Sequence, residues 1–349
     1  MKDLTVQLNV TIRQAMKTLN KTAEKCLLVV DEDQKLLGTL SDGDIRKALL
    51  KGFVIGNLIN EIYNVNPTKL SDGNYSIKDA KAIFLNNKFD LIPIVNQDGK
   101  VVDSLVWERV FGNKTKNTKK LVGIPVIIMA GGKGTRLEPF TKVLPKPLIP
   151  IHDKPIIQHI IERFVNKGVE DFYLSINYKG HILKAFFEEL QPNYNFQFIE
   201  EQRPLGTAGS LHLLKNRIEK PFFVTNCDII IKADYANLYE FHQKGKYDIT
   251  LVASAKEYII PYGTCELNDN GHLSHINEKP KYDFLINTGL YVLNPDVLNL
   301  IPKNKFYHIT HLIEDAKNQG KKVGVFPIDD DSWIDIGQWA EYRKAIDKF

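Results

Sequence analysis

Residues 126–151 of the chain have the sequence VIIMAGGKGTRLEPFTKVLPKPLIPI. The stretch begins with four apolar residues, Val126–Met129, as expected of a parallel strand that is buried on both faces. Three glycines follow, Gly131, Gly132 and Gly134. Glycines let a backbone approach a ligand closely and leave N–H groups facing it, which suits phosphate. The stretch therefore predicts a phosphate-binding loop at the end of a central strand.

Two cations, Arg136 and Lys146, lie further along this loop and narrow the choice of ligand. A glycine turn with fixed cations after a buried strand is suited to a nucleoside triphosphate. The order of residues differs from that of a Walker A loop, Gly-x-x-x-x-Gly-Lys-Ser/Thr. It also differs from the dinucleotide fingerprint, because Gly134 is followed by Thr135 and Arg136 rather than by x-x-Gly.

The composition is ordinary for a soluble globular protein, with 43% hydrophobic and 25% charged residues. The net charge of +4 is mild and the basic residues are spread out, so nucleic acid is not an expected partner. No apolar run reaches the roughly 18 residues of a membrane span, and the N-terminus lacks the apolar core of a signal peptide. Cys26, Cys227 and Cys265 form no C-x-x-C pair, which fits a reducing cytoplasm and predicts neither a disulfide nor a zinc site.

The two halves of the chain differ in pattern, and the length of 349 residues favours two domains. Residues 11–50 and 76–111 repeat each other at a constant offset, so that Leu40 corresponds to Leu105. Each repeat is expected to form helix, strand, turn, strand and helix. Such repetition indicates that each unit buries its apolar face against the other. In the first repeat the expected elements are a helix from Ile12, strands at 26–30 and 36–40, and a helix at 42–50.

From about Gly123 onward, predicted strands alternate with predicted helices. This alternation predicts a mostly parallel sheet covered by helices, with ligands at the carboxyl ends of the strands. The length of this half is sufficient for a three-layer domain with a large core. The expected strands are 126–129, 171–176, 196–200 and 221–225, and the expected helices are 155–166, 181–190 and 207–214.

The pattern G-G-x-G-T-R-L followed by P-K-P resembles the signature of the sugar-1-phosphate nucleotidyltransferases, and further matching clusters extend to Asp335. The resemblance implies a Rossmann-like, GT-A-like α/β domain with a mostly parallel sheet over residues 123–349. It also implies transfer of a nucleotide from an NTP to a sugar 1-phosphate, with release of pyrophosphate. Arg136 and Lys146 correspond to catalytic cations of the family. The nucleotide-binding residues implied in the loop are Gly131, Gly132, Gly134 and Thr135.

The first half, residues 1–115, resembles a pair of CBS domains (a Bateman module), at about 1–60 and 61–115. A short polar linker at 116–122 is expected to join it to the second domain. CBS pairs often associate with another pair, so the resemblance also implies a homo-oligomer.

The CBS resemblance rests on residues 38–44, GTLSDGD. In that family Ser/Thr-x-x-Asp closes on a nucleotide ribose, and the matching residues are Ser41 and Asp44, so an adenine or guanine nucleotide is an implied ligand. Ser41 is equally suited to cap the helix at 42–50. The second repeat has Val106 and Arg109 at the equivalent positions, so at most one half-site keeps the ribose contact. A purely structural or dimerising module is the alternative.

The run at 201–210, EQRPLGTAGS, corresponds to the loop that holds the base in the nucleotidyltransferases. Its implied nucleotide-binding residues are Glu201, Gly206 and Thr207. Glu201 stands where the family faces the Watson–Crick edge of the base. Guanine offers two adjacent donors there, which a carboxylate can accept, whereas uracil or thymine would suit an amide better. The run therefore favours GTP, with a surface residue or a helix cap as the alternative role for Glu201.

Two carboxylates are implied ligands of Mg²⁺. Asp228 follows the apolar strand at 221–225, and Asp335 lies in the run Trp-Ile-Asp-Ile-Gly that ends at Gly337. Magnesium is commonly bound by one or two carboxylates together with substrate phosphates. Cys227 is small and is expected to be inert, because the transfer needs no covalent intermediate. The acidic run 329–331 is interpreted as a solvated turn rather than a metal site.

A further cluster of residues corresponds to the sugar-phosphate site of the family. The resemblance implies that Lys279 contacts the sugar phosphate, that Glu278 and Asn287 bind sugar hydroxyls, and that the amide of Gly263 assists. Without the resemblance, Glu278 and Lys279 would be interpreted as an exposed charged turn.

The implied reaction is in-line attack of the sugar phosphate on the α-phosphorus of the NTP, with catalysis by positioning and charge neutralisation. A CBS pair ahead of the catalytic domain resembles the guanylyltransferases of bacterial legionaminic acid pathways, which implies glucosamine 1-phosphate as the sugar. Mannose, glucose and heptose phosphates remain open, as does an enzyme of this fold that uses UTP or CTP. A non-catalytic nucleotide sensor is the alternative from another class. The chain ends soon after Asp335, so no acetyltransferase domain is expected.

Overall fold

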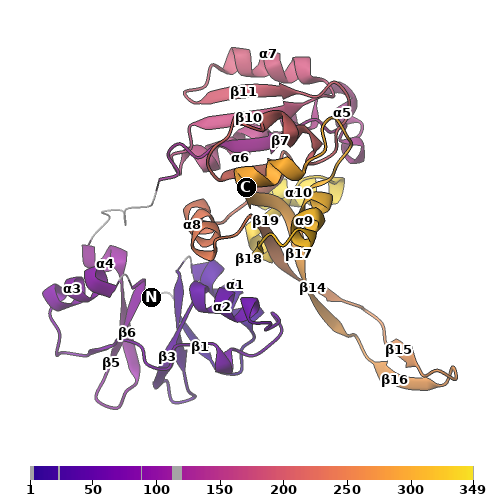
Figure 1. Cartoon of the computed structure of the whole chain (residues 1–349). Coiled ribbons are helices and arrows are strands. Elements are labelled where there is room, and N and C mark those ends of the chain that lie inside the picture. Colours follow the sequence, from indigo (N-terminus) through magenta and orange to yellow (C-terminus); the bar gives the residue numbers. More distant parts are fainter. Residues whose placement is uncertain (1–3, 23, 88, 112–119, 349) are drawn as a thin grey trace. The chain divides into compact units, whose positions relative to one another are not determined.

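The computed structural model describes residues 4–22, 24–87, 89–111 and 120–348 (Figure 1). The described residues divide into two compact units. The first unit contains the residues up to 111 together with 254–286 and 329–331, and the second contains the remainder. Much of the predicted linker at 116–122 lies outside the described residues.

The predicted repeat is confirmed as two small sheets with the same connectivity. Each has a parallel pair followed by an antiparallel pair, with a register shift at the equivalent place. The first sheet is β1 (Thr5–Gln7), β2 (Cys26–Val30) and β3 (Leu36–Ser41), and the second is β4 (Leu70–Ser71), β5 (Leu91–Val95) and β6 (Val101–Val106). Their helices are α1 (Ile12–Thr22), α2 (Asp42–Leu50), η1 (Ile59–Glu61), α3 (Ile77–Asn87) and α4 (Trp107–Phe111).

Apolar residues of the two repeats pack against each other. Leu28 of β2 and Leu91 of β5 share a buried cluster with Leu4 and Cys26. Within the first repeat, α1 places its apolar residues on one face at helical spacing, and that face is buried. Because β2 and β5 are apolar along their whole length, neither sheet could stand alone without exposing that surface to water.

A long two-stranded ribbon also belongs to the first unit. It is formed from the outer parts of β14 (Ile249–Ile259) and β17 (Lys281–Leu293), with β15 (Thr264–Leu267) and β16 (Leu273–Asn277) at its end. Arg13 of α1 contacts the base of the ribbon. Its Nη1 donates to the carbonyl oxygen of Ala255 at 2.9 Å, its Nη2 pairs with Asp283, and the side chain is buried.

The second unit is built on a seven-stranded sheet in the order β11-β10-β7-β12-β17-β14-β18. Four neighbouring strands are parallel, namely β11 (Asn195–Glu200), β10 (Asp171–Ile176), β7 (Val126–Met129) and β12 (Phe222–Asn226). β17 pairs with β12 in the antiparallel direction, and β18 (Val323–Asp329) forms the other edge. The prediction of an α/β fold with a mostly parallel central sheet is confirmed.

Side chains of β7 alternate between two buried layers, which explains why all four of its residues are apolar. Val126 and Ile128 contact one core, and Ile127 and Met129 contact the other. The first core is covered by α6 (Ile156–Val165), α7 (Gly180–Leu190), α8 (Tyr235–Gly245) and α10 (Trp339–Lys348). The second core is covered by η4 (Gly209–Leu214), η5 (Pro295–Leu300) and α9 (Ile309–Asn318).

Two sequence-based expectations differ from the structure. The helix expected at 207–214 is a shorter 3₁₀ helix, η4, because the N–H groups of Ala208 and Gly209 donate to the carbonyl oxygen of Tyr307. The acidic run at 329–331 is not simply a solvated turn. Asp329 is buried and accepts hydrogen bonds from Asn20 Nδ2 and the Asp331 amide, both at 3.1 Å.

The remaining elements are short. They are η2 (Thr135–Leu137), α5 (Phe140–Val143), η3 (Lys146–Leu148), β8 (Pro150–Ile151), β9 (Lys154–Pro155), β13 (Ile229–Ile231), η6 (Asp330–Ser332) and β19 (Trp333–Asp335). Within the described ranges, no helix combines the length and apolar character that crossing a bilayer requires.

Candidate active site

The glycine loop leaves the carboxyl end of β7, between the ends of β10 and β12, and its glycines are needed for different reasons. Gly134 has φ of +67°, and a Cβ atom there would stand 2.9 Å from Thr141 Cγ2 and 3.0 Å from Lys146 Cβ. Fold geometry therefore requires glycine at 134. A Cβ atom on Gly132 would meet no atom within 4 Å. The protein itself does not require glycine at 132, which points to close approach of a ligand.

Three hydrogen bonds fix the segment that follows the glycines. Thr141 Oγ1 donates to the Gly134 carbonyl oxygen at 3.0 Å, and the indole N–H of Trp339 donates to the Glu138 carbonyl oxygen at 2.9 Å. Lys179 Nζ donates to the carbonyl oxygen of Lys142 at 2.6 Å. Because two of these bonds come from Trp339 and Lys179, which lie outside this segment, the loop is organised before any ligand binds.

Three of the predicted charged residues surround Gly337. A Cβ atom at this glycine would lie 2.9 Å from Asp228 Oδ2, 2.9 Å from Asp335 Oδ1 and 3.3 Å from Arg136 Nη2. Any larger residue would displace them, so the absence of a side chain at 337 allows both carboxylates and the guanidinium to meet. The structure therefore brings together residues that are separated by up to about 200 positions in the sequence.

The two carboxylates meet because β13 and β19 pair. In this antiparallel pair of strands Ile229 lies opposite Asp335, and the amide of Ile336 donates to the carbonyl oxygen of Asp228 at 2.8 Å. The Gly337 amide in turn donates to Asp335 Oδ1 at 2.7 Å. Backbone pairing thus places Asp228 and Asp335 side by side at the edge of the glycine loop.

Lys146 completes this group as a buried cation. Its ammonium pairs with Asp228 Oδ2, and the lysine and aspartate side chains are only 9% and 13% exposed. Burial raises the pKa of Asp335, and the negative charge of Asp228 adds to this effect. Two adjacent carboxylates in a partly buried site favour a bound cation, because each destabilises the charged form of the other.

The pair Asp228 and Asp335 fits a magnesium ion. Hard oxygen ligands suit Mg²⁺, which usually takes one or two protein carboxylates and completes its shell with phosphates and water. In the part of the chain that the structure describes, no group of three or more metal-ligating side chains occurs, so substrate phosphates and water would complete the coordination of an ion at this pair. Burial raises the pKa of the neighbouring Cys227 thiol to about 12, so that it stays protonated, as expected of an inert residue.

Glu201 is neither a surface residue nor a helix cap. It is buried, its Oε1 accepts from Ser175 Oγ at 2.6 Å and its Oε2 accepts from the Leu205 amide at 3.0 Å. A Cβ atom on Gly131 would lie 3.0 Å from Oε1 of Glu201. The carboxylate therefore lies against the first glycine of the loop and also holds its own loop closed.

The other residues predicted in this loop have structural partners. Gly206 has φ of +80°, and a Cβ atom there would stand 2.7 Å from the Tyr307 carbonyl oxygen. Thr207 Oγ1 accepts from the amide of Ile309 at 3.0 Å, which caps the start of α9. The Ala208 and Gly209 amides donate to the carbonyl oxygen of Tyr307, so they are not available to a ligand.

The predicted sugar-binding residues lie on or beside the ribbon. Glu278 points toward Gly263, where a Cβ atom would lie 3.0 Å from its Oε2. Lys279 has φ of +48°, an uncommon conformation for a non-glycine residue that often marks a functional position. Asn287 lies on β17 in the second unit, and its Oδ1 accepts from the Gly289 amide at 3.1 Å.

Ser41 and Asp44 form a reciprocal capping box at the start of α2. Ser41 Oγ donates to Asp44 Oδ2 at 2.6 Å, and the Asp44 amide donates back to Ser41 Oγ at 3.1 Å. The capping role of Ser41 is therefore confirmed. A ribose contact at these two residues stays a prediction.

Sequence reasoning missed the residues that hold Glu201 in place. Ser175 and Ser210 are fully buried, their Oγ atoms lie 2.7 Å apart, and Asn177 Nδ2 donates to the Glu201 carbonyl oxygen at 2.6 Å. The signal that could have found Ser175 is a hydroxyl at the end of an otherwise apolar central strand.

Comparisons with known proteins identify the family of the chain. A family profile described as nucleotidyl transferase matches residues 125–349, and the CBS domain profile matches residues 1–51. The chain belongs to the nucleotidyl transferase family and carries an N-terminal CBS domain.

Curated relatives include the mannose-1-phosphate guanyltransferases of two fungi. That of Yarrowia lipolytica is 35% identical over 61% of this chain and 60% of the relative. That of Hypocrea jecorina is 40% identical over 50% of each chain. The chain thus spans about half to three fifths of the length of these curated relatives.

Solved structures give the same fold. The crystal structure of HddC from Yersinia pseudotuberculosis is 29% identical with a TM-score of 0.51, and the match covers 65% of this chain and 99% of that chain. A second crystal structure of HddC, complexed with GMP-PN, is 28% identical with a TM-score of 0.50 and the same coverage.

A first prediction separates the two roles of glycine in the loop. Gly132→Ala should keep the melting temperature within about 2 °C of the parent, because the new methyl group enters open space. It should raise KM for the nucleotide at least tenfold, because the ligand loses close approach. The matched control is Gly134→Ala, which should lose about 1–3 kcal/mol of stability because of its positive φ. An unchanged KM in Gly132→Ala would show that no ligand approaches the backbone there.

A second prediction concerns the Lys146–Asp228 ion pair. Lys146→Met or Asp228→Asn should each lower the free energy of unfolding by about 3 kcal/mol, because one charge is left buried without its partner. The double variant should lose less than the sum of the two single losses. Urea unfolding measures all three, and strictly additive losses would contradict a direct ionic coupling. Turnover should fall in every variant, including the more stable double variant.

Proposed function

We propose that the chain transfers a guanylyl group from GTP to a sugar 1-phosphate, giving a GDP-sugar and pyrophosphate. One observation carries the proposal. Arg136, Lys146, Asp228 and Asp335 come from four separate elements, yet they converge at the end of the glycine loop around Gly337. Two cations and two carboxylates beside an open glycine backbone match the needs of phosphate transfer rather than those of a structural ion-pair network.

The reaction is an in-line displacement at the α-phosphorus of GTP. The sugar phosphate oxygen is already an anion, so no general base is required. Arg136, exposed beside the loop, stabilises the departing pyrophosphate, and Lys146 stabilises charge on the α-phosphate. Lys279 on the ribbon is assigned to the attacking phosphate. Catalysis then consists of holding two phosphates in line and neutralising their charge.

Asp228 and Asp335 would hold the magnesium ion. When bound, Mg²⁺ supplies positive charge that offsets the phosphate oxygens. The two aspartates also orient the cations around them. Asp228 fixes the ammonium of Lys146, and Asp335 is itself fixed by the Gly337 amide.

The choice of base is assigned to Glu201. Its carboxylate has about four acceptor positions, and two are used by Ser175 and the Leu205 amide. The remaining two can accept the N1–H and N2–H₂ donors of guanine. The names of the curated relatives, which are guanyltransferases, and the complex of HddC with GMP-PN support the same base.

The sugar is assigned to the ribbon, with Gly263 and Glu278 side by side and Asn287 on β17. The CBS domain ahead of the catalytic domain favours glucosamine 1-phosphate, for surface glycan or legionaminic acid synthesis in the cytoplasm. Mannose 1-phosphate is the second candidate, because the curated relatives at 35–40% identity are named for it.

The proposal is tested by measuring pyrophosphate release from four NTPs with a panel of sugar 1-phosphates. GTP should give the highest kcat/KM. In Arg136→Ala, kcat should fall by about 10²–10³, the usual loss when one preorganised charge is removed, while the melting temperature stays unchanged because the side chain is exposed. Near-normal turnover in this variant, or no product with any pair of substrates, would refute the proposed reaction.

Base selection is tested with Glu201→Gln. The amide oxygen can still accept from Leu205 and the amide NH₂ can donate to Ser175 Oγ, so the fold should persist. One acceptor facing guanine becomes a donor, so kcat/KM for GTP should fall at least tenfold relative to UTP. Glu201→Ala is the control, since it should also destabilise the loop. An unchanged ratio of GTP to UTP in Glu201→Gln would mean that Glu201 has only a structural role.

A further inference from the structure

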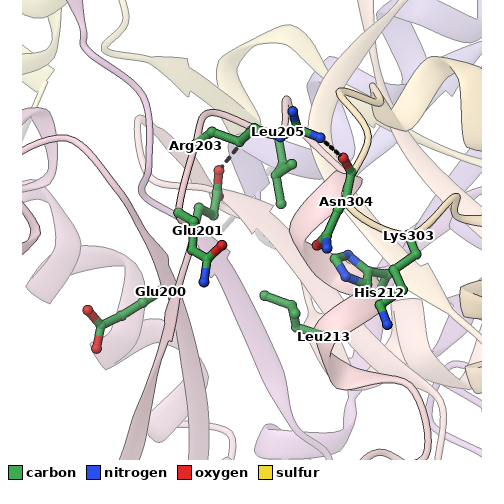
Figure 2. A pocket seen from close by; sticks show the side chains of 9 residues that line it. Glu200, Glu201, Arg203, Leu205, His212, Leu213, Lys303 and Asn304 are labelled. Atoms are coloured by element: carbon green, nitrogen blue, oxygen red, sulfur yellow. Dashed lines mark hydrogen bonds between the residues drawn. The ribbon is translucent and has the colours of Figure 1, made fainter.

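A cavity of about 550 Å³ lies beside the loop that begins at Glu201, and Figure 2 shows the residues that line it. Its walls come from the end of β11, the loop at 202–205, η4 and residues 303–304. No residue of the glycine loop at 131–136 lines it. The volume is within the range of roughly 300–1,000 Å³ that is typical of small-molecule sites.

Two cationic side chains, Arg203 and Lys303, and the imidazole of His212 line this cavity. Arg203 donates one N–H to the carbonyl oxygen of Asn304, a neutral acceptor, and keeps its other donors. Among the ion pairs that involve the described residues, neither Arg203 nor Lys303 takes part. Two cations therefore line one cavity without a carboxylate partner.

His212 has a defined tautomer in this site. Its Nδ1 lies 2.7 Å from the carbonyl oxygen of Gly209 and must donate its proton there. The other ring nitrogen, Nε2, is left for the cavity. In Figure 2 the side chains of His212, Lys303 and Asn304 lie together on one wall.

The two carboxylates in the lining do not neutralise these cations. Glu200 pairs with Lys184, whose Nζ lies 2.6 Å from its Oε1. Glu201 directs its carboxylate to Ser175 and the Leu205 amide. The cavity therefore favours an anion.

Part of the lining is apolar. Leu213 is 36% exposed, and Leu205 lies on the opposite wall. A ligand that fills the cavity would cover Leu213 and remove it from water, which is favourable for an apolar or planar body.

We propose that this cavity binds an organic phosphate, with the phosphate on Arg203 and Lys303 and an apolar or planar body against Leu213. His212 Nε2 accepts a hydrogen bond from the ligand or, when protonated, donates one to the phosphate. The cavity contains no residue of the glycine loop of the proposed GTP site, but Glu201, the proposed base-selecting residue, forms part of its lining. The cavity shares the loop at 201–205 with that site, so an occupant would brace the loop that carries Glu201. This last consequence rests on the proposed function, but binding itself does not.

The test is calorimetric titration of the full chain with phenyl phosphate, which combines a phosphate dianion with a planar apolar body. Wild-type protein should bind phenyl phosphate more tightly than inorganic phosphate, and phenol should not bind measurably. The double variant Arg203→Gln/Lys303→Gln should weaken the binding of phenyl phosphate at least tenfold. The single variant Lys303→Gln should weaken the binding of phenyl phosphate at least threefold. Because Lys303 is exposed, this variant replaces the double variant if the latter is unstable.

Two controls locate the binding site. Lys305→Gln changes an exposed lysine of the same segment that does not line the cavity, and it should leave the dissociation constant within twofold. Arg136→Ala removes a cation of the proposed catalytic site and should also leave it unchanged. Loss of binding in Arg136→Ala, no effect of Lys303→Gln and the double variant, or no binding by the wild type would each overturn the proposal. Calorimetric titration measures binding without turnover. A failure of the proposed enzymatic activity would therefore leave these results unchanged.

Discussion

The pairing of β13 with β19 is the contact on which the catalytic group depends. Asp228 and Asp335 belong to segments more than 100 residues apart. Asp228 directly precedes β13 and Asp335 ends β19, and each of these strands has only three residues. Backbone hydrogen bonds between these two short strands fix the positions of the two aspartates relative to each other. Their carboxylates are thus left to bind cations. Gly337 then provides the space in which the two carboxylates and Arg136 meet. A side chain at 337 would separate the charges to which the proposed phosphate transfer is assigned.

In the proposed function, the charges in this group face a triphosphate, which carries more negative charge than the site itself. Lys146 is buried and paired with Asp228, so its position is fixed without a ligand. Arg136 is exposed and can follow the phosphates. Burial and the neighbouring Asp228 raise the pKa of Asp335, and a bound cation would relieve that repulsion. One fixed cation, one adaptable cation and a carboxylate pair are together suited to a reaction in which charge moves between phosphate groups.

Much of the fold could be predicted from the sequence because its signals are local. The apolar run Val126–Met129 is a buried central strand, and the expected helix from Ile12 buries its apolar face. The predictions failed where distant backbone decided the outcome. The helix expected at 207–214 is shortened because the Tyr307 carbonyl oxygen takes the amides that would start it, and Asp329 is buried through contact with Asn20. The hydrophobic periodicity of the sequence contains no signal for the contact with Tyr307 or for the contact with Asn20.

For the candidate site, the sequence predicted the charged residues that the structure brings together around Gly337, because their order along the chain resembles a known family. It did not predict how those side chains are held. The buried pair of Lys146 with Asp228 and the hydroxyl of Ser175 on Glu201 join residues far apart in the sequence. Spacing alone carries no information about such partners, which depend on the strand order of the sheet.

In the proposed function, the contacts of Glu201 contribute both to the stability of its loop and to the choice of base. A carboxylate held by a hydroxyl on one oxygen and by a backbone amide on the other cannot rotate without breaking both bonds. Its free acceptor positions are therefore fixed relative to Gly131, which lies against the same oxygen as Ser175. A base that presents a donor at each free position gains both hydrogen bonds at little cost in conformational entropy. A base that presents an acceptor there would leave a buried charge facing a lone pair, a penalty larger than the loss of one hydrogen bond. The same two contacts that close the loop at 201–205 thus supply its capacity to discriminate.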